Sequence, residues 1–327
     1  MLALDDRTGN VLTTIALFAT IVAVAFAAKT TIVVFVLALL FAYILEPAVA
    51  WVQGVLRQPS SRTSAIAVVY VGGLIAMAGI GSTFAPAIAG QWQRLRAEVP
   101  GMLARLTDHR FLAEHGSQIT AVAQRAGHAL GVAAADAGWL LLVPVIAVFF
   151  LSHRADFIDG TVTLFAHRHD RASVTRTVGQ VDSMLAQYVR AQLALAVMSS
   201  VIYSGSMALL GFPYPLALGV MGGALEFIPI AGWILGAAII LAAGWLAGAP
   251  WIWMAVVIAI WKTLEGVVVS PRMMGHRLAL DPLTVLFALM AGGQIAGVLG
   301  VVLSVPAAAV LRILWLERTS GRKAAAA

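Results

Sequence analysis

The residue with the clearest chemical potential in this sequence is Glu226, a carboxylate deep inside an apolar stretch, three residues before Pro229. An ionised side chain at the middle of a bilayer costs at least about 2.5–3.5 kcal/mol, so such groups normally face a cavity or one another. Pro229 has no amide hydrogen and leaves the carbonyl of residue 225 without its helical partner. A carboxylate beside freed carbonyls can hold a cation, a proton or a polar solute. We therefore predict a transport site at Glu226; the alternative is a structural glutamate hydrogen-bonded to a neighbouring helix.

Three further polar residues lie in apolar surroundings. Lys262 and Glu265 are three positions apart, which places them on one face of a helix. They fit a neutralising ion pair that merely permits insertion as well as a transport role. Gln294 offers a hydrogen-bond donor and an acceptor among glycines. Those glycines fit either close helix packing or an unwound backbone that binds substrate.

The elements that must position these side chains belong to a membrane protein. Hydrophobic residues make up 61% of the 327 residues and charged residues only 11%, against about 25% in an average soluble domain. A soluble core of this size could not cover its surface with so few charges. Most of this chain is therefore solvated by lipid.

Eight apolar runs predict an all-α polytopic membrane protein with about eight membrane segments. The runs cover residues 11–28, 31–52, 63–89, 137–152, 191–210, 215–246, 251–269 and 283–316. As straight helices, the runs 215–246 and 283–316 would each be about 50 Å long, whereas the hydrocarbon core is about 30 Å thick. Glycine and proline near their middles favour a break. We predict two helical hairpins in the C-terminal third, with tips near residues 226–232 and 292–300.

The distribution of basic residues favours this hairpin topology. With both termini cytoplasmic and both long runs folded back, about 12 Lys and Arg residues lie inside and about 6 outside. If both runs crossed once, the count would fall to about 10 against 8. We therefore expect a multi-pass protein of the bacterial inner membrane.

The chain divides into five predicted segments. They are three membrane helices (1–90), an amphipathic extramembrane helical module (91–136), the fourth and fifth membrane helices with a polar linker (137–210), a transport core with broken helices (211–317) and a polar, alanine-rich tail (318–327). In the module, Trp92, Leu95 and Val99 recur at helical spacing. This stripe packs on the rest of the protein or lies on the bilayer, unless it holds a partner.

Several function classes find no support in the sequence. The chain has no cysteine, so it has no disulfide, thiolate metal site or cysteine nucleophile. It has no dinucleotide loop, Walker-type loop, nucleophile elbow or zinc-protease helix. His167 and His169 lack further ligands, and we expect them in a solvated loop. The net charge of +6 is spread over connecting segments, which argues against a nucleic-acid partner. We predict no enzyme activity, catalytic residue, cofactor or metal.

An ordered set of motifs resembles the autoinducer-2 exporter family of permeases over nearly the whole chain. The motifs are Tyr188-Val189-Arg190-x-Gln192, Glu226-Phe227-Ile228-Pro229-x-x-Gly232, Pro271-Arg272 with Asp281-Pro282-Leu283, and Gly292-Gly293 with Gly297-x-x-Gly300 and Pro306, after an opening helix pair that ends in the residues 43–49. The resemblance implies a polytopic inner-membrane protein with about eight membrane segments, and homo-oligomers, with a ring of five as one form. It also implies efflux of autoinducer-2, a small polar furanone derivative, or sodium or lithium/proton antiport. Asp281 stands where the family usually has histidine, which would change local charge and proton chemistry.

Three functions follow as hypotheses. The first is a secondary transporter that exports a small polar solute with ion or proton coupling, the second is a Na+(Li+)/H+ antiporter, and the third is a non-transporting membrane scaffold. The expected partners are membrane lipid, a small polar solute or a monovalent cation or proton, and further copies of the chain. The predicted substrate- and ion-binding residues are Glu226, Pro229, Gly232, Lys262, Glu265, Asp281, Gln294, Arg190 and Gln192. The predicted hinge and hairpin-tip glycines are Gly222, Gly223, Gly292, Gly293, Gly297 and Gly300.

Overall fold

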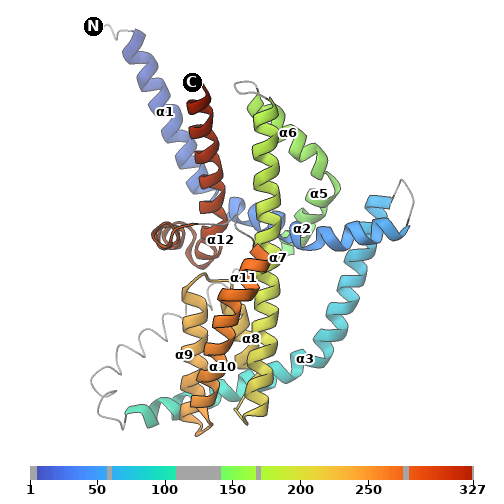
Figure 1. Ribbon diagram of the computed structural model, residues 1–327, viewed down its shortest axis with the longest axis vertical. Coiled ribbons are helices and arrows are strands. Elements are labelled where there is room, and N and C mark those ends of the chain that lie inside the picture. The colour runs from blue at the N-terminus through green and yellow to red at the C-terminus, as the bar shows by residue number, and fades with distance from the viewer. Residues whose placement is uncertain (1–5, 57–60, 108–140, 167–170, 275–279, 326–327) are drawn as a thin grey trace.

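The computed structural model describes residues 6–56, 61–107, 141–166, 171–274 and 280–325, and these residues form helices without strands (Figure 1). The helices are α1 (Asp6–Ala27), α2 (Lys29–Leu56), α3 (Ser61–Thr107), α5 (Leu142–Ser152), α6 (Arg154–Ala166), α7 (Arg171–Leu209), α8 (Pro215–Leu225), α9 (Ala231–Leu246), α10 (Trp251–Leu264), the π-helix η2 (Glu265–Val269), α11 (Ser270–Met274) and α12 (Pro282–Ala325).

The prediction of an all-α polytopic membrane protein is confirmed. Five helical stretches in the described residues are long and apolar enough to cross a bilayer: Lys29–Leu56, Arg62–Glu98, Arg171–Leu209, Trp251–Met273 and Leu283–Thr319. The apolar helices α5, α8 and α9 are shorter. Large apolar side chains such as Phe18 and Leu209 are exposed on the outer surface, as lipid contact requires.

The first predicted hairpin is formed by α8 and α9, whose intervening turn covers residues 226–230. Ile230 adopts φ 63° and ψ −55°, and the amide of Ala231 donates to the carbonyl of Pro229 at 2.7 Å. This is a γ-turn, a conformation that is strained for a β-branched residue. At Gly232, a Cβ would lie 1.7 Å from the carbonyl oxygen of Leu225, so only glycine fits where α9 leaves the turn.

The second predicted hairpin lies within α12. Its backbone leaves the helical region at Ala296 and at Gly297, where φ is 58° and ψ is −138°. The two arms meet at glycines, because a Cβ on Gly300 would lie 1.9 Å from the carbonyl oxygen of Gly292. In Figure 1, the first arm is seen almost end-on and the second arm rises beside α1 to the C-terminus. Both hairpin tips thus lie where the sequence predicted them.

Two connecting regions are continuous with neighbouring apolar helices. The polar linker consists of α6 and the first half of α7, so the fifth apolar run is the second half of a long helix. The apolar helix α3 continues without interruption into the amphipathic module as far as Thr107. In the described part of that module, Trp92 and Leu95 pack against the core formed around α7 and α8. Residues 108–136, His167 and His169 lie outside the described residues.

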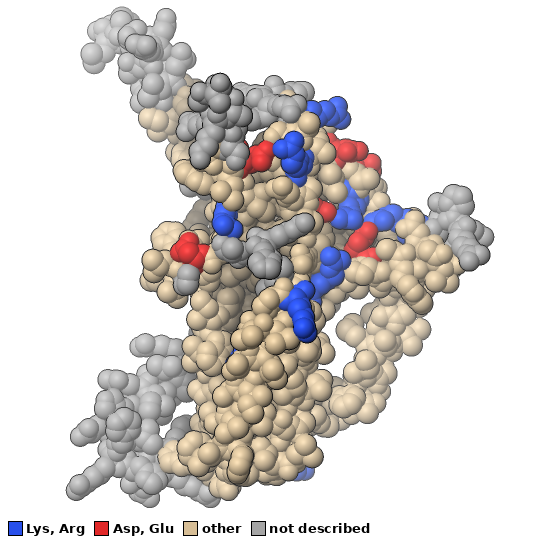
Figure 2. Space-filling view, in the orientation of Figure 1, with Lys and Arg blue, Asp and Glu red and all other residues tan. Residues whose placement is uncertain are grey.

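The long helix α7 connects two halves of the molecule (Figure 1). Its second half packs with α8, α9 and α10 around Tyr203, Met207, Leu218 and Ile240. Its first half lies beside α2 and α6. On the face in Figure 2, charged side chains gather over this first half, and the surface around α8–α10 is almost free of them. The apolar half therefore has the character of a membrane-embedded unit.

Candidate functional site

Three charged side chains meet inside the apolar half, and we call them the acidic triad: Glu226, Lys262 and Glu265. Nζ of Lys262 lies 2.5 Å from Oε1 of Glu226 and 2.7 Å from Oε2 of Glu265. The Glu226 side chain is 6% exposed, and the side chains of Lys262 and Glu265 are each 15% exposed. The three side chains of the triad are therefore largely buried, and their charges must be compensated within the protein.

The triad depends on two irregular elements. Glu226 is the first residue after α8, in the turn that the γ-turn at Ile230 closes. Lys262 belongs to the last turn of α10, and Glu265 begins the π-helix η2. Single π-turns inside α-helices are rare and frequently occur at functional sites. Both carboxylates are thus presented by backbone that has left the α-helical pattern.

Helix α7 supports the triad from one side. Gln192 Nε2 donates to the backbone carbonyl of Glu226 at 2.5 Å, and the hydroxyl of Tyr203 donates to Oε1 of Glu226 at 3.3 Å. One turn from Tyr203, Ser199 accepts a hydrogen bond from the indole of Trp261 at 2.9 Å, which fixes α10 beside α7. Gly223 lets α8 approach, since a Cβ there would lie 2.0 Å from Oγ of Ser200. The triad is therefore held by a close-packed frame rather than by a loose loop.

The charge of the triad does not balance. Two carboxylates share one ammonium, so the fully ionised group carries a net charge of −1 in surroundings of low dielectric. One proton or one monovalent cation would neutralise it. Chemically, the arrangement can exchange a proton for a cation or orient a polar solute that carries hydrogen-bond donors.

The structure brings together four of the predicted binding residues and separates three others. Gln192 joins the acidic triad, and Pro229 and Gly232 build the turn beside it. Gln294 is exposed on the first arm of the α12 hairpin, and Arg190 is exposed on α7.

Asp281 is exposed and forms the N-cap of α12. Its Oδ1 accepts the backbone amide of Thr284 at 2.9 Å, and its Oδ2 accepts the hydroxyl of the same residue. These side-chain and backbone hydrogen bonds hold the pKa of Asp281 below its ordinary value. In this conformation Asp281 caps a helix instead of lining the triad.

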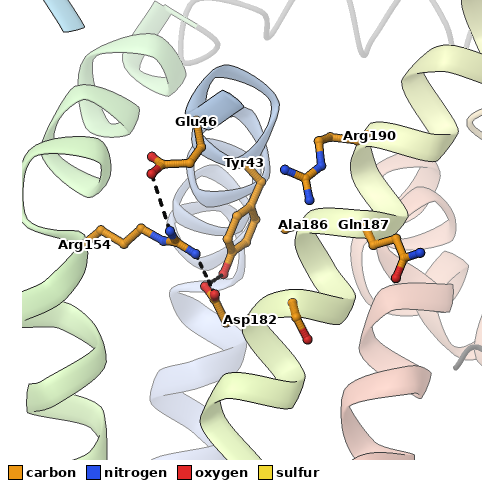
Figure 3. A pocket seen from close by; sticks show the side chains of 8 residues that line it. Tyr43, Glu46, Arg154, Asp182, Ala186, Gln187 and Arg190 are labelled. Carbon is orange, nitrogen blue, oxygen red and sulfur yellow. Dashed lines mark hydrogen bonds and ion pairs between the residues drawn. The ribbon is translucent and has the colours of Figure 1, made fainter. Parts of the chain in front are cut away.

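A second charged network, which sequence reasoning did not identify, lies at the other half of α7 (Figure 3). Arg154 pairs with Asp182 at 2.6 Å and with Glu46 at 3.4 Å, and Glu46 also pairs with Arg62 at 3.0 Å. The hydroxyl of Tyr43 donates to Asp182 at 2.8 Å. We call these residues the interfacial network. Glu46 lies near the end of an apolar run, and its partners Arg62 and Arg154 are 16 and 108 positions away, so spacing alone gives no signal.

The fold and the triad define a class of protein. An all-α multi-pass membrane protein with buried charges at the tip of a helical hairpin has the features of membrane transport proteins. The family model described as "AI-2E family transporter" matches residues 15–318, and the chain belongs to this family.

Relatives from several bacteria carry transport names. The chain is 27% identical to "Putative transport protein YhhT" of Escherichia coli (strain K12), over 97% of this chain and 93% of that protein. It is 31% identical to "Putative transport protein YrrI" and 28% identical to "Putative transport protein YueF", both of Bacillus subtilis (strain 168). The matches to the two Bacillus proteins cover about half of their length, 48% of each.

Proposed function

We propose that this protein is a secondary transporter that exports a small polar solute of the autoinducer-2 type, with the acidic triad as the ion- or proton-coupling site. The observation that carries the proposal is the excess carboxylate. A pair of Lys262 with one glutamate would suffice for neutral insertion, but both Glu226 and Glu265 contact the same ammonium. The surplus negative charge is best neutralised by a proton or a monovalent cation that can bind and leave.

The hairpin that carries Glu226 supplies the moving part in this proposal. Its turn is strained at Ile230, and strained backbone persists where the surroundings over-determine it. Arrival of a proton or cation weakens the pull of Lys262 on Glu226. The turn can then relax and open a path for the solute on one side. Gln192 and Tyr203 hold the turn in the closed state through two atoms of one residue, the backbone carbonyl oxygen and Oε1 of Glu226.

The direct test compares cells that express the wild type with cells that express Glu226→Gln or Glu265→Gln. Metabolites in medium and cytoplasm identify the exported solute by its loss from cells with active protein, and flux into inverted vesicles then measures it. Each variant keeps the size of the side chain but removes the surplus charge, so coupled export should fall at least about tenfold. Asp156→Asn changes an exposed acid on α6 and serves as the matched control. Wild-type flux and wild-type pH dependence in both variants would remove this function.

Sodium or lithium/proton antiport is the second candidate, and the net charge of −1 favours it because such a site can hold either a proton or one monovalent cation. In proteoliposomes with an imposed pH gradient, sodium addition should collapse the gradient in the wild type. Glu226→Gln should prevent the collapse. A pure solute exporter would leave the gradient unchanged in both, which separates the two candidates.

We further propose that the charged half faces the cytoplasm of a bacterial inner membrane, with both termini on that side, and that the protein forms homo-oligomers. The support is the basic excess of about 12 against about 6 predicted by the hairpin topology. Cysteine labelling from each side of sealed vesicles tests the orientation, which is practical because the chain has no native cysteine. Native mass spectrometry tests the assembly, for which five copies are the expected number.

A further inference from the structure

A cavity of about 450 Å³ lies beside the interfacial network, between α2, α6 and α7 (Figure 3). Most of its lining residues have polar or charged side chains. The side chains that matter here are Tyr43, Glu46, Arg154, Asp182, Gln187 and Arg190. A volume of this size accommodates a small organic molecule.

The acids of the cavity are already satisfied. Glu46 accepts hydrogen bonds from Arg62 and Arg154, and Asp182 accepts them from Arg154 and Tyr43. Each carboxylate therefore has its charge compensated by neighbouring donors. Neither carboxylate needs a cation from outside.

The bases of the cavity are not fully used. Nε of Arg154 is buried and has no hydrogen-bond partner among the described residues. The guanidinium of Arg190 lines the cavity with no ion pair to any acid that the structure describes. Figure 3 shows Arg154 and Arg190 approaching Tyr43 from opposite sides, from α6 and α7. Arg62 pairs with Glu46 but does not itself line the cavity. Counted together with it, three guanidinium groups accompany two carboxylates, so the net charge of the cavity and its ion pairs is +1.

We infer that this cavity binds a small organic monoanion, with a carboxylate as the group that Arg190 recognises. A guanidinium offers two parallel donors that match the two oxygens of a carboxylate, and such bidentate pairs are among the strongest hydrogen bonds in proteins. The monoanion neutralises the surplus positive charge and gives the free donors their acceptors. Gln187 and Tyr43 provide polar contacts for the remainder of the molecule.

The inferred site is separate from the acidic triad and does not rest on the function proposed for it. Arg190 and Gln192 are two positions apart on α7, so their side chains point about 200° apart around the helix axis. Gln192 contacts the turn of Glu226, and Arg190 faces the cavity. One helix thus carries an anion site of net charge +1 on one face and a cation-seeking site of net charge −1 on the other.

Titration of the purified, detergent-solubilised protein with lactate, inorganic phosphate and neutral glycerol tests the inference by calorimetry. Lactate should bind saturably and glycerol should not. Arg190→Gln should weaken lactate binding about tenfold or more. Arg190→Lys keeps the charge but loses the two parallel donors of the guanidinium, so its lactate affinity should lie between those of the wild type and Arg190→Gln. Arg176→Gln, an exposed arginine earlier on α7, should bind like the wild type.

Arg190 has no ion pair in the described residues, so its replacement should leave the melting temperature without ligand unchanged, and a failure to bind is then not a failure to fold. Equal lactate affinity in the wild type and Arg190→Gln would overturn the inference. So would binding of phosphate without lactate. A third contrary result is a response only to nanodiscs that contain phosphatidylglycerol, which would assign the cavity to a lipid headgroup.

Discussion

The acidic triad and the interfacial network show two ways to place charge in a largely apolar protein. The triad has two carboxylates and one ammonium, its side chains are largely buried, and its carboxylates lie beside a γ-turn and in a π-helix. The network sets two arginines against two carboxylates, is about one-third exposed at its arginines, and joins regular helices. Burial makes each charge of the triad energetically expensive, whereas water screens those of the network. We therefore expect the triad to dominate both stability and transport.

Removal of the central cation should have the largest effect. Lys262→Met leaves two buried carboxylates without a cationic partner, and breaking a buried ion pair from one side costs about 3–5 kcal/mol. Thermal unfolding in detergent measures the loss, and Lys29→Met, at the exposed start of α2, is the control. Addition of Glu226→Gln to Lys262→Met should restore part of the stability because one unpaired charge disappears. No restoration would mean that the lysine acts through packing alone.

The hairpin tip gives the next largest expected effect. Gly232→Ala would place a Cβ 1.7 Å from the carbonyl oxygen of Leu225, so the turn must shift at a cost of about 3 kcal/mol. Gly236→Ala, one turn further along α9, meets its nearest atom, Cα of Gly222, at 3.4 Å and should change the unfolding free energy by less than about 1 kcal/mol. Equal effects at the two glycines would show that the tip is looser than its packing indicates.

The sequence predicted the triad side of this comparison far better than the network side. Apolar run length against bilayer thickness predicted both hairpins, and the rarity of charge in lipid singled out Glu226, Lys262 and Glu265. The interfacial network could not be predicted because its residues lie in four polar or boundary segments. Charged residues are common in such segments, and no single position is unusual. Only the packing of α2 and α6 against α7 brings Glu46, Arg154 and Asp182 together.

The continuity of the polar linker with the fifth apolar run is not predicted by the sequence, for a related reason. Residues 153–190 are polar enough to be read as a linker, yet α6 and the start of α7 are helices that pack on each other and bury Val162 and Thr177. The role of Tyr203 was equally hidden. It lies in an apolar run 23 positions before Glu226, and only the folded hairpin brings its hydroxyl to that carboxylate.

The interfacial network should respond to salt, and the triad should not. Arg154→Gln removes two ion pairs whose arginine side chain is 36% exposed, so the expected loss is only about 1 kcal/mol. An increase from 0.05 to 0.5 M salt should shrink this loss, because the Debye length falls from about 14 Å to about 4 Å. Parallel melting curves of Arg154→Gln and Lys262→Met at both salt concentrations test the contrast. A salt-sensitive Lys262→Met would place the triad in contact with solvent.

Asp281 is expected to give the smallest effect, and it lies outside both clusters. The hydrogen bonds from Thr284 hold its pKa below the unfolded value, so its contribution to stability is present above the unfolded pKa and is lost as the pH falls through the folded pKa. Asp281→Asn keeps a capping side chain but loses the charge. The melting temperature of Asp281→Asn should be slightly lower than that of the wild type at pH 7, and the difference between the two should vanish at acid pH. Thr284→Val, which removes the hydroxyl donor and keeps the amide, should reduce the same pH-dependent difference in part. A difference that persists unchanged to pH 3 would mean that Asp281 acts through its shape and not its charge.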